Sequence, residues 1–286
     1  MTKINSISPL KHKYLQIIDT IAKKPKMLYI KGTLPNERLP TVAIVGTRKP
    51  TAYGKEVTYQ LAYELAQHGI VIVSGLALGI DGIAHRACLD AGGTTIAVLG
   101  NGLDTIYPAA HRGLAAEIIE KGGAIISEYS PEVLPRDFQF LARNRIVSGL
   151  SDAVIVTEAS TRSGTMATVA RALEQGREVF VVPGNITSPM SAGCNELLKQ
   201  GAHPVTRGED ILEIIAPHLL RGQSALPLGN TPLESTIISL IQSGIRDGDE
   251  LLNASHSDTS EFSQTLTIME INGTIRALGG NQWTLR

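Results

Sequence analysis

The chain has 286 residues, a length that fits one large domain with a small appendage. Hydrophobic residues make up 43% and charged residues 19%, as in a globular protein with a sizeable core. No run of about 18 uncharged apolar residues occurs and the N-terminus lacks a secretory signal pattern, so we expect a cytoplasmic protein without a membrane segment. The net charge of −1 argues against a protein that coats nucleic acid through its overall field, but it allows a local basic groove.

The first elements predicted along the chain are a weak helix over residues 11–24 and a short strand over Met27–Lys31, which form a lead-in at residues 1–40. Helix-periodic segments then alternate with apolar runs of strand length, which are Val42–Val45, Ile70–Val73, Thr94–Leu99, Ala124–Ser127, Ala153–Thr157 and Glu178–Val182. Continuous apolar strands that alternate with helices indicate a parallel sheet covered on both faces. We therefore predict an α/β fold for residues 41–216, an extended Rossmann-like, doubly wound parallel sheet.

Three junctions between strands and loops are rich in glycine and small hydroxyl residues, and two of them carry an arginine. The junctions are Gly46-Thr47-Arg48, Ser74-Gly75 and Arg162-Ser163-Gly164-Thr165. Such loops leave backbone N–H groups open to an anion at the start of a helix. In a doubly wound sheet these loops lie beyond the carboxyl ends of the strands, where ligands bind. We expect these residues to bind phosphate groups, although surface ion pairing of Arg48 and capping by Ser163 are the ordinary alternatives.

Arg143 and Arg145 lie in a segment that is predicted to be helical. Residues two apart on a helix point in different directions, so the two side chains flank an apolar stripe. We expect at least one of them to bind anions, while the other can pair with an acid inside the fold.

The sequence offers no clear set of catalytic or metal-binding residues. Asp81 and His85 are four residues apart on one predicted helix face, and they can form a hydrogen-bonded pair that more often fixes a loop than catalyses a reaction. Cys88 and Cys194 lack metal-ligand spacing and are expected to be buried. We therefore predict no catalytic residues, no metal and no cofactor.

Residues 217–230 contain prolines and glycines and are predicted to be a linker. In residues 231–286, Thr231-Pro232-Leu233-Glu234 has the pattern of a helix start, and two more helices and a hairpin with a Gly279-Gly280-Asn281 turn follow. Three helices and a hairpin indicate a winged-helix-like domain. From Thr231 onwards, three arginines face seven acids, a balance of −4, and the other residues carry 23 basic and 20 acidic side chains.

Several long motifs, in order along Tyr14 to Ile215, resemble the DNA-processing protein DprA (Smf) family. They are Ala43 to Gly54 (AIVGTRKPTAYG), Ser74 to His85 (SGLALGIDGIAH), Ala97 to Asp104 (AVLGNGLD), Arg143-Asn144-Arg145-Ile146 with Gly149-Leu150-Ser151, and Val182-Pro183-Gly184. The resemblance implies a protein without known catalytic activity that binds single-stranded DNA. It also implies a homodimer that loads the RecA recombinase during natural transformation.

Within this resemblance, Arg48 matches a DNA-contacting arginine, and Arg162 stands where the family usually has lysine. His111 replaces a common asparagine.

Two other classes of function stay open beside this one. The first is a nucleotide-binding, phosphoribohydrolase-like enzyme of related fold, but in this chain Gly164-Thr165 is followed by Met166-Ala167-Thr168 in place of the catalytic glutamate. The second is a nucleotide-sensing regulator whose winged helix reads DNA. The acidic balance of residues 231–286 predicts instead that this part serves protein contacts or regulation.

Overall fold

The computed structural model describes residues 3–221 and 231–285, which fall into two compact units divided between Pro217 and His218. Each unit has its own hydrophobic core. No helix among the described residues is long and apolar enough to cross a membrane.

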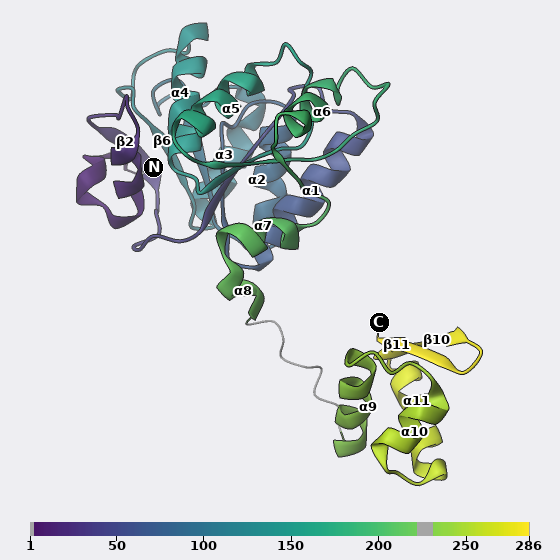
Figure 1. Cartoon of the computed structure of the whole chain (residues 1–286). Coiled ribbons are helices and arrows are strands. Elements are labelled where there is room, and N and C mark those ends of the chain that lie inside the picture. The colour runs from purple at the N-terminus through teal and green to yellow at the C-terminus, as the bar shows by residue number, and fades with distance from the viewer. Residues whose placement is uncertain (1–2, 222–230, 286) are drawn as a thin grey trace. The chain divides into compact units, whose positions relative to one another are not determined.

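The first unit, which runs from purple to green in Figure 1, is built on a nine-stranded sheet. The strand order is β1-β2-β6-β5-β4-β3-β7-β8-β9. The seven strands from β6 to β9 in this order are parallel, and they are β3 (Thr41–Val45), β4 (Val71–Ser74), β5 (Thr95–Leu99), β6 (Ala124–Ser127), β7 (Ala153–Val156), β8 (Glu178–Val181) and β9 (His203–Pro204). The six predicted core strands are thus confirmed. From β3 the chain moves outward through β4, β5 and β6 and then returns to β7 on the other side of β3, so the strand order reverses between β3 and β7.

Helices cover both faces of this sheet, as the apolar strands predict. On one face α1 (Ala52–Gln67) packs against α2 (Ile80–Asp90), which also contacts α3 (Arg112–Glu120), and α7 (Gly208–Ile215) packs against α1. On the other face α4 (Asp137–Gly149) packs against α5 (Gly164–Glu174). Other helical segments of this unit are η1 (Pro9–Lys11), η2 (Lys13–Thr20), η3 (Ala109–His111) and α6 (Ala192–Lys199).

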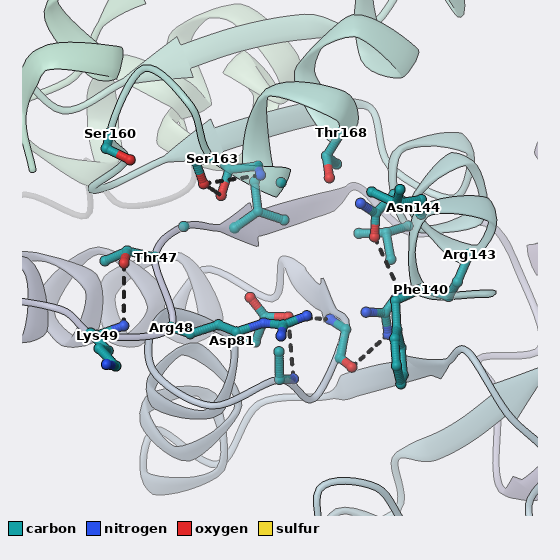
Figure 2. Close-up of a pocket in the computed structure, with 18 of the residues that line it drawn as sticks. Thr47, Arg48, Lys49, Asp81, Phe140, Arg143, Asn144, Ser160, Ser163 and Thr168 are labelled. Atoms are coloured by element: carbon teal, nitrogen blue, oxygen red, sulfur yellow. Dashed lines mark hydrogen bonds between the residues drawn. The ribbon is translucent and has the colours of Figure 1, made fainter. Parts of the chain in front are cut away.

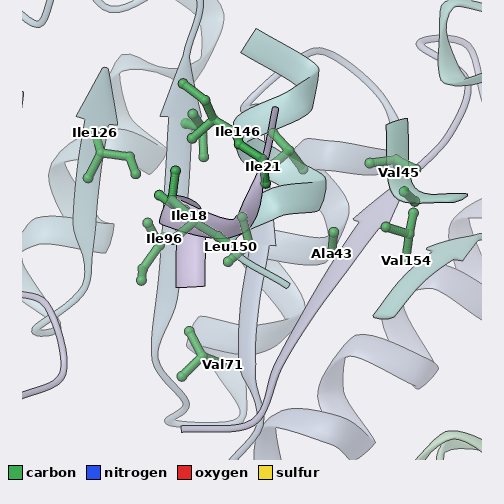
Figure 3. Close-up of a cluster of buried hydrophobic side chains, with 14 of the residues drawn as sticks. Ile18, Ile21, Ala43, Val45, Val71, Ile96, Ile126, Ile146, Leu150 and Val154 are labelled. Carbon is green, nitrogen blue, oxygen red and sulfur yellow. The ribbon is translucent and has the colours of Figure 1, made fainter. Parts of the chain in front are cut away.

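The N-terminal segment differs from the prediction. Two strands, β1 (Asn5–Ile7) and β2 (Leu28–Gly32), extend the sheet, with β2 antiparallel to β6, and β1 was not predicted. The helix expected over residues 11–24 is a 3₁₀ helix, η2 (Lys13–Thr20). Figure 3 shows Ile18 and Ile21 packed among Ile146 and Leu150, at the end of α4, over the sheet. The lead-in is therefore part of the main core.

The predicted linker at 217–230 begins with a short helix, α8 (Pro217–Arg221), and residues 222–230 lie outside the described residues. The second unit then has the predicted elements in the predicted order: α9 (Pro232–Gln242), α10 (Gly248–Ser255), α11 (Thr259–Ile271) and the hairpin of β10 (Ile275–Gly279) and β11 (Gln282–Leu285). Thr231 caps α9 by accepting a hydrogen bond from the Glu234 amide at 3.1 Å. The winged-helix assignment stays a prediction that these elements agree with.

Candidate functional site

A cavity of about 630 Å³ opens at the carboxyl ends of the parallel strands, beside the point where the strand order reverses. We call it the central cavity. Loops after β3, β4 and β7 and one side of α4 line it, and Figure 2 shows side chains from these segments around one space. Among the lining residues are Gly46, Thr47, Arg48, Lys49, Gly75, Asp81, Phe140, Arg143, Asn144, Ser160, Ser163, Gly164, Thr165 and Thr168. The three predicted junctions therefore do come together.

The loop after β4 is held by the buried carboxylate of Asp81. Its Oδ2 accepts hydrogen bonds from the amides of Gly75 at 3.0 Å and Ala77 at 3.3 Å. Burial raises the pKa of Asp81, and the charge of Arg143 opposes that rise. The Gly75 amide that was predicted to face a phosphate is thus already used inside the fold.

Arg143 lies under the same loop and is 5% exposed. Its Nη1 donates to the carbonyl oxygens of Gly75, at 2.6 Å, and Val98. A side chain on Gly75 would bring its Cβ within 2.5 Å of Nη2, so this close approach requires glycine. Burial lowers the pKa of Arg143 to about 10, the charge of Asp81 opposes this fall, and the charge of Arg48 adds to it. Arg143 is thus protonated at neutral pH, and its charge lies at the floor of the cavity beside the Asp81 carboxylate.

The loop after β3 presents the cations that the fold leaves free. The Thr47 amide donates to the Glu158 carbonyl at 2.8 Å, and Thr47 Oγ1 accepts from the Lys49 amide at 3.2 Å. These bonds fix the backbone on both sides of Arg48. Arg48 and Lys49 are exposed, and within residues 3–221 and 231–285 the structure records no ion pair for either. Their charges are available to an anionic ligand.

The N-terminus of α5 forms the wall opposite Arg48 (Figure 2). Ser163 caps this helix, since its Oγ accepts from the Thr165 amide at 3.1 Å and lies 2.9 Å from Thr165 Oγ1. A Cβ added to Gly164 would meet no atom within 4 Å, so the helix start is open. The positive end of the helix dipole thus adds to the cations of the opposite loop.

Three predicted site residues do not line the central cavity. Ser74 is fully buried and donates to the Ile44 carbonyl at 2.6 Å. Arg145 makes a two-pronged ion pair with Glu128, at 2.7 and 2.6 Å, and also donates to the Lys23 carbonyl at 2.7 Å. It is therefore the arginine that pairs inside the fold. Arg162 is exposed on the loop before α5 but is not among the lining residues.

The predicted pairing of Asp81 with His85 is not formed. His85 is fully buried, and its Nδ1 lies 2.7 Å from Thr95 Oγ1, while its Nε2 has no hydrogen-bond partner among the described residues. Burial lowers the pKa of His85 to about 3. Asp81 instead serves the alternative role of fixing a loop. The described residues also contain no group of three or more side chains able to hold a metal ion.

Sequence reasoning missed several residues of the site. Lys49 adjoins Arg48 and was open to the same argument, whereas Phe140 and Asn144 reach the cavity only through the packing of α4. Glu158 was also missed: its carboxylate accepts from the Thr51 amide at 2.8 Å and from Thr51 Oγ1 at 2.6 Å. This acid at the end of β7 therefore anchors the start of α1 beside the Arg48 loop.

Comparison of the sequence with known proteins identifies the family that it matches. Residues 5–216 match the family model of DNA recombination-mediator protein A. Protein Smf of Escherichia coli is 49% identical over 189 residues, covering 66% of this chain and 50% of that protein. The match thus spans half of the Escherichia coli protein's length, whereas DNA processing protein DprA of Streptococcus pneumoniae is 44% identical over 73% of this chain and 74% of its own.

Two solved structures resemble this chain over about three quarters of its length. The X-ray structure of DprA from Streptococcus pneumoniae has a TM-score of 0.70 at 43% identity and covers 74% of this chain and 75% of its own. A structure that describes the single-stranded DNA binding mode of DNA processing protein A from Helicobacter pylori has a TM-score of 0.65 at 35% identity. It covers 78% of this chain and 99% of its own.

Proposed function

The chain belongs to the DNA recombination-mediator protein A family, and from this premise we propose that it binds single-stranded DNA as a recombination mediator. The observation that carries the proposal is the central cavity, which Arg48, Lys49 and the open N-terminus of α5 line together at the reversal of strand order. Positively charged side chains and a helix N-terminus around one concave space can bind the negatively charged phosphate backbone of DNA.

The chemistry of the cavity favours a single strand over a duplex. A single strand is flexible enough to follow a groove between loops, and it exposes bases that can stack on aromatic side chains. Phe140 lines the cavity and stacks on Tyr107 with ring centroids 5.4 Å apart. Because so few aromatic side chains are present, we expect the affinity to come chiefly from phosphate contacts and to depend little on base sequence.

The individual site residues belong to this proposal. Arg48 and Lys49 bind phosphates directly, and Gly164 and Thr165 offer the start of α5. The loops are held in shape by Gly46, Thr47, Gly75, Ser163 and Arg143. Arg162, exposed on the loop before α5, contributes long-range attraction, whereas Ser74 and Arg145 serve the fold.

We also propose that the protein catalyses no reaction. The related nucleotide hydrolases carry a catalytic glutamate after a Gly-Thr pair, and this chain has Met166-Ala167-Thr168 there. The nearby Glu158 carboxylate is occupied by Thr51. Loading of RecA, homodimerisation and a cytoplasmic location complete the proposal on the strength of the family.

A competition experiment tests the proposed function. A fluorescently labelled single-stranded oligonucleotide bound to the full chain is challenged with unlabelled single strand, duplex or mononucleotide at one salt concentration. We expect the single strand to compete best and the mononucleotide to compete poorly. Preferential displacement by a mononucleotide, or release of a free base from it, would favour the nucleotide-hydrolase alternative instead.

A further inference from the structure

A second cavity, of about 500 Å³, adjoins the central one on the other side of the Arg48 loop. We call it the flanking cavity. It lies between the start of α1, the start of α2 and η3, and among its lining residues are Arg48, Lys49, Lys55, Tyr59, Arg86 and His111. Arg48 and Lys49 line both cavities, so the two spaces meet at these side chains.

The lining of the flanking cavity contains basic side chains and, among the described residues, no carboxylate. Two acids lie close by, but both are occupied. Glu117 pairs with Arg86 at 2.6 Å, and Asp90 lies 4.0 Å from Arg86 and accepts from the Tyr59 hydroxyl at 3.0 Å. Lys55 is exposed and, within the described part of the chain, takes part in no recorded ion pair. Its positive charge is therefore uncompensated.

The walls of the flanking cavity are held in place. His111 lies 2.9 Å from the Leu76 carbonyl through its Nδ1, and its ring packs so closely on Gly82 that a Cβ there would lie 2.5 Å from Cε1. Gly79, with a φ of 80°, lets the start of α2 approach the Arg48 loop. These contacts fix the sides of the cavity that α2 and η3 form.

We propose that the flanking cavity is a second phosphate subsite, centred on Lys55, for the same single strand that enters the central cavity. This inference rests on the proposed function and adds the path of the strand, which crosses Arg48 from one cavity to the other. A guanidinium with five donors can bind phosphates on both sides of the crossing. Tyr59, an aromatic side chain in the wall, can stack a base there.

Because the two subsites bind one covalent strand, the second acts at a high effective concentration once the strand is long enough to reach it. A strand confined to the central cavity gains nothing from Lys55. The inference therefore predicts a step in affinity with oligonucleotide length, and it predicts that Lys55 contributes only above that step.

The test measures the affinity of the full chain for oligothymidylates of about 3 to about 16 nucleotides, a range that spans the usual site sizes. In Lys55→Gln we expect the longer oligonucleotides to bind about two- to fivefold more weakly, and the shortest ones to bind as in the wild type. Lys55→Arg, which keeps the charge, is expected to restore the step. Lys26→Gln, at another exposed lysine without a recorded ion pair, is the control of equal charge and is expected to have no effect.

The outcomes separate the inference from the proposed function. A wild type that fails to bind any single strand contradicts both. A wild type that binds with the same length dependence in Lys55→Gln overturns the second subsite alone, as does an equal loss at every length. A loss of mononucleotide affinity in Lys55→Gln would likewise overturn it, because the cavity would then serve a free nucleotide.

Discussion

The arginines of the first unit show that one residue type can serve the fold or the ligand, depending on its partners. Arg143 donates to the buried carbonyl oxygens of Gly75 and Val98, and Arg145 is paired with Glu128. Arg48 has neither kind of partner in the described residues, although it lies in a loop that hydrogen bonds fix on both sides. Removing Arg143 or Arg145 should therefore affect stability, and removing Arg48 should affect binding.

We expect Arg145→Ala to lower the free energy of unfolding by about 1–3 kcal/mol, because it leaves the part-buried Glu128 without its partner and frees the Lys23 carbonyl. Urea unfolding followed by circular dichroism measures this change. The salt dependence of DNA binding by the folded variant is expected to match the wild type. A variant of normal stability that has lost DNA binding would show that Arg145 contacts the ligand after all.

Buried His85 makes stability depend on pH. Its pKa is lowered to about 3 in the folded protein, so the unfolded chain, with an ordinary pKa near 6.5, binds the proton more tightly between these values. The free energy of unfolding therefore has its full value above about pH 6.5 and decreases as the pH falls, by about 2 kcal/mol at pH 5. We expect this loss between pH 7 and pH 5 to be smaller in His85→Gln. Equal losses in both proteins, measured by urea unfolding, would contradict the assignment.

Among the helices and strands, those with a clear local sequence pattern were predicted correctly. Each of the six core strands is a continuous apolar run, and Thr231 caps α9 as its pattern indicated. Strand order could not be predicted, because it depends on which apolar faces meet in three dimensions. The same limit applied to β1, a three-residue strand whose partner β2 lies more than 20 residues away.

The candidate site was predictable to a similar degree. Glycine-rich junctions identified the loops after β3, β4 and β7, which do meet at one cavity. The acceptors of the backbone amides in these loops were not predictable. The Gly75 amide donates to the Asp81 carboxylate, and the Thr47 amide donates to the Glu158 carbonyl. These partners come from other elements, and no local pattern marks them.

The N-terminal 3₁₀ helix illustrates an element whose role the sequence understated. Ile18 of η2 is fully buried against α4 and the sheet (Figure 3). We expect Ile18→Ala to lower the free energy of unfolding by about 2–5 kcal/mol, as for other buried isoleucines. Urea unfolding checks this value, with exposed Ile186→Ala, 91% exposed in the wild type, as a control that should cost little. A decrease below about 0.5 kcal/mol would mean that η2 is not part of the cooperative core.

For the whole molecule, the two units differ in charge. The exposed face of α11 carries Glu261 and Glu270 and no lysine or arginine, so a polyanion would be repelled from it. We expect a chain that ends after Arg221 to keep an affinity for single-stranded DNA within a few-fold of the full chain. Both chains are measured at one salt concentration. A hundredfold loss from a folded truncation would contradict the charge argument and assign DNA contacts to the second unit.

Arg48 in the central cavity is proposed to bind the backbone of single-stranded DNA, and the salt dependence of the affinity reports this contact. For the wild type, Arg48→Ala and the control Arg276→Ala in the second unit, the logarithm of the affinity for a labelled single strand is plotted against the logarithm of the salt concentration. We expect Arg48→Ala to bind more weakly and to reduce the magnitude of the slope by about 0.7 for each phosphate that the variant no longer neutralises, with Arg276→Ala unchanged. Wild-type affinity and slope in a folded Arg48→Ala would contradict the account.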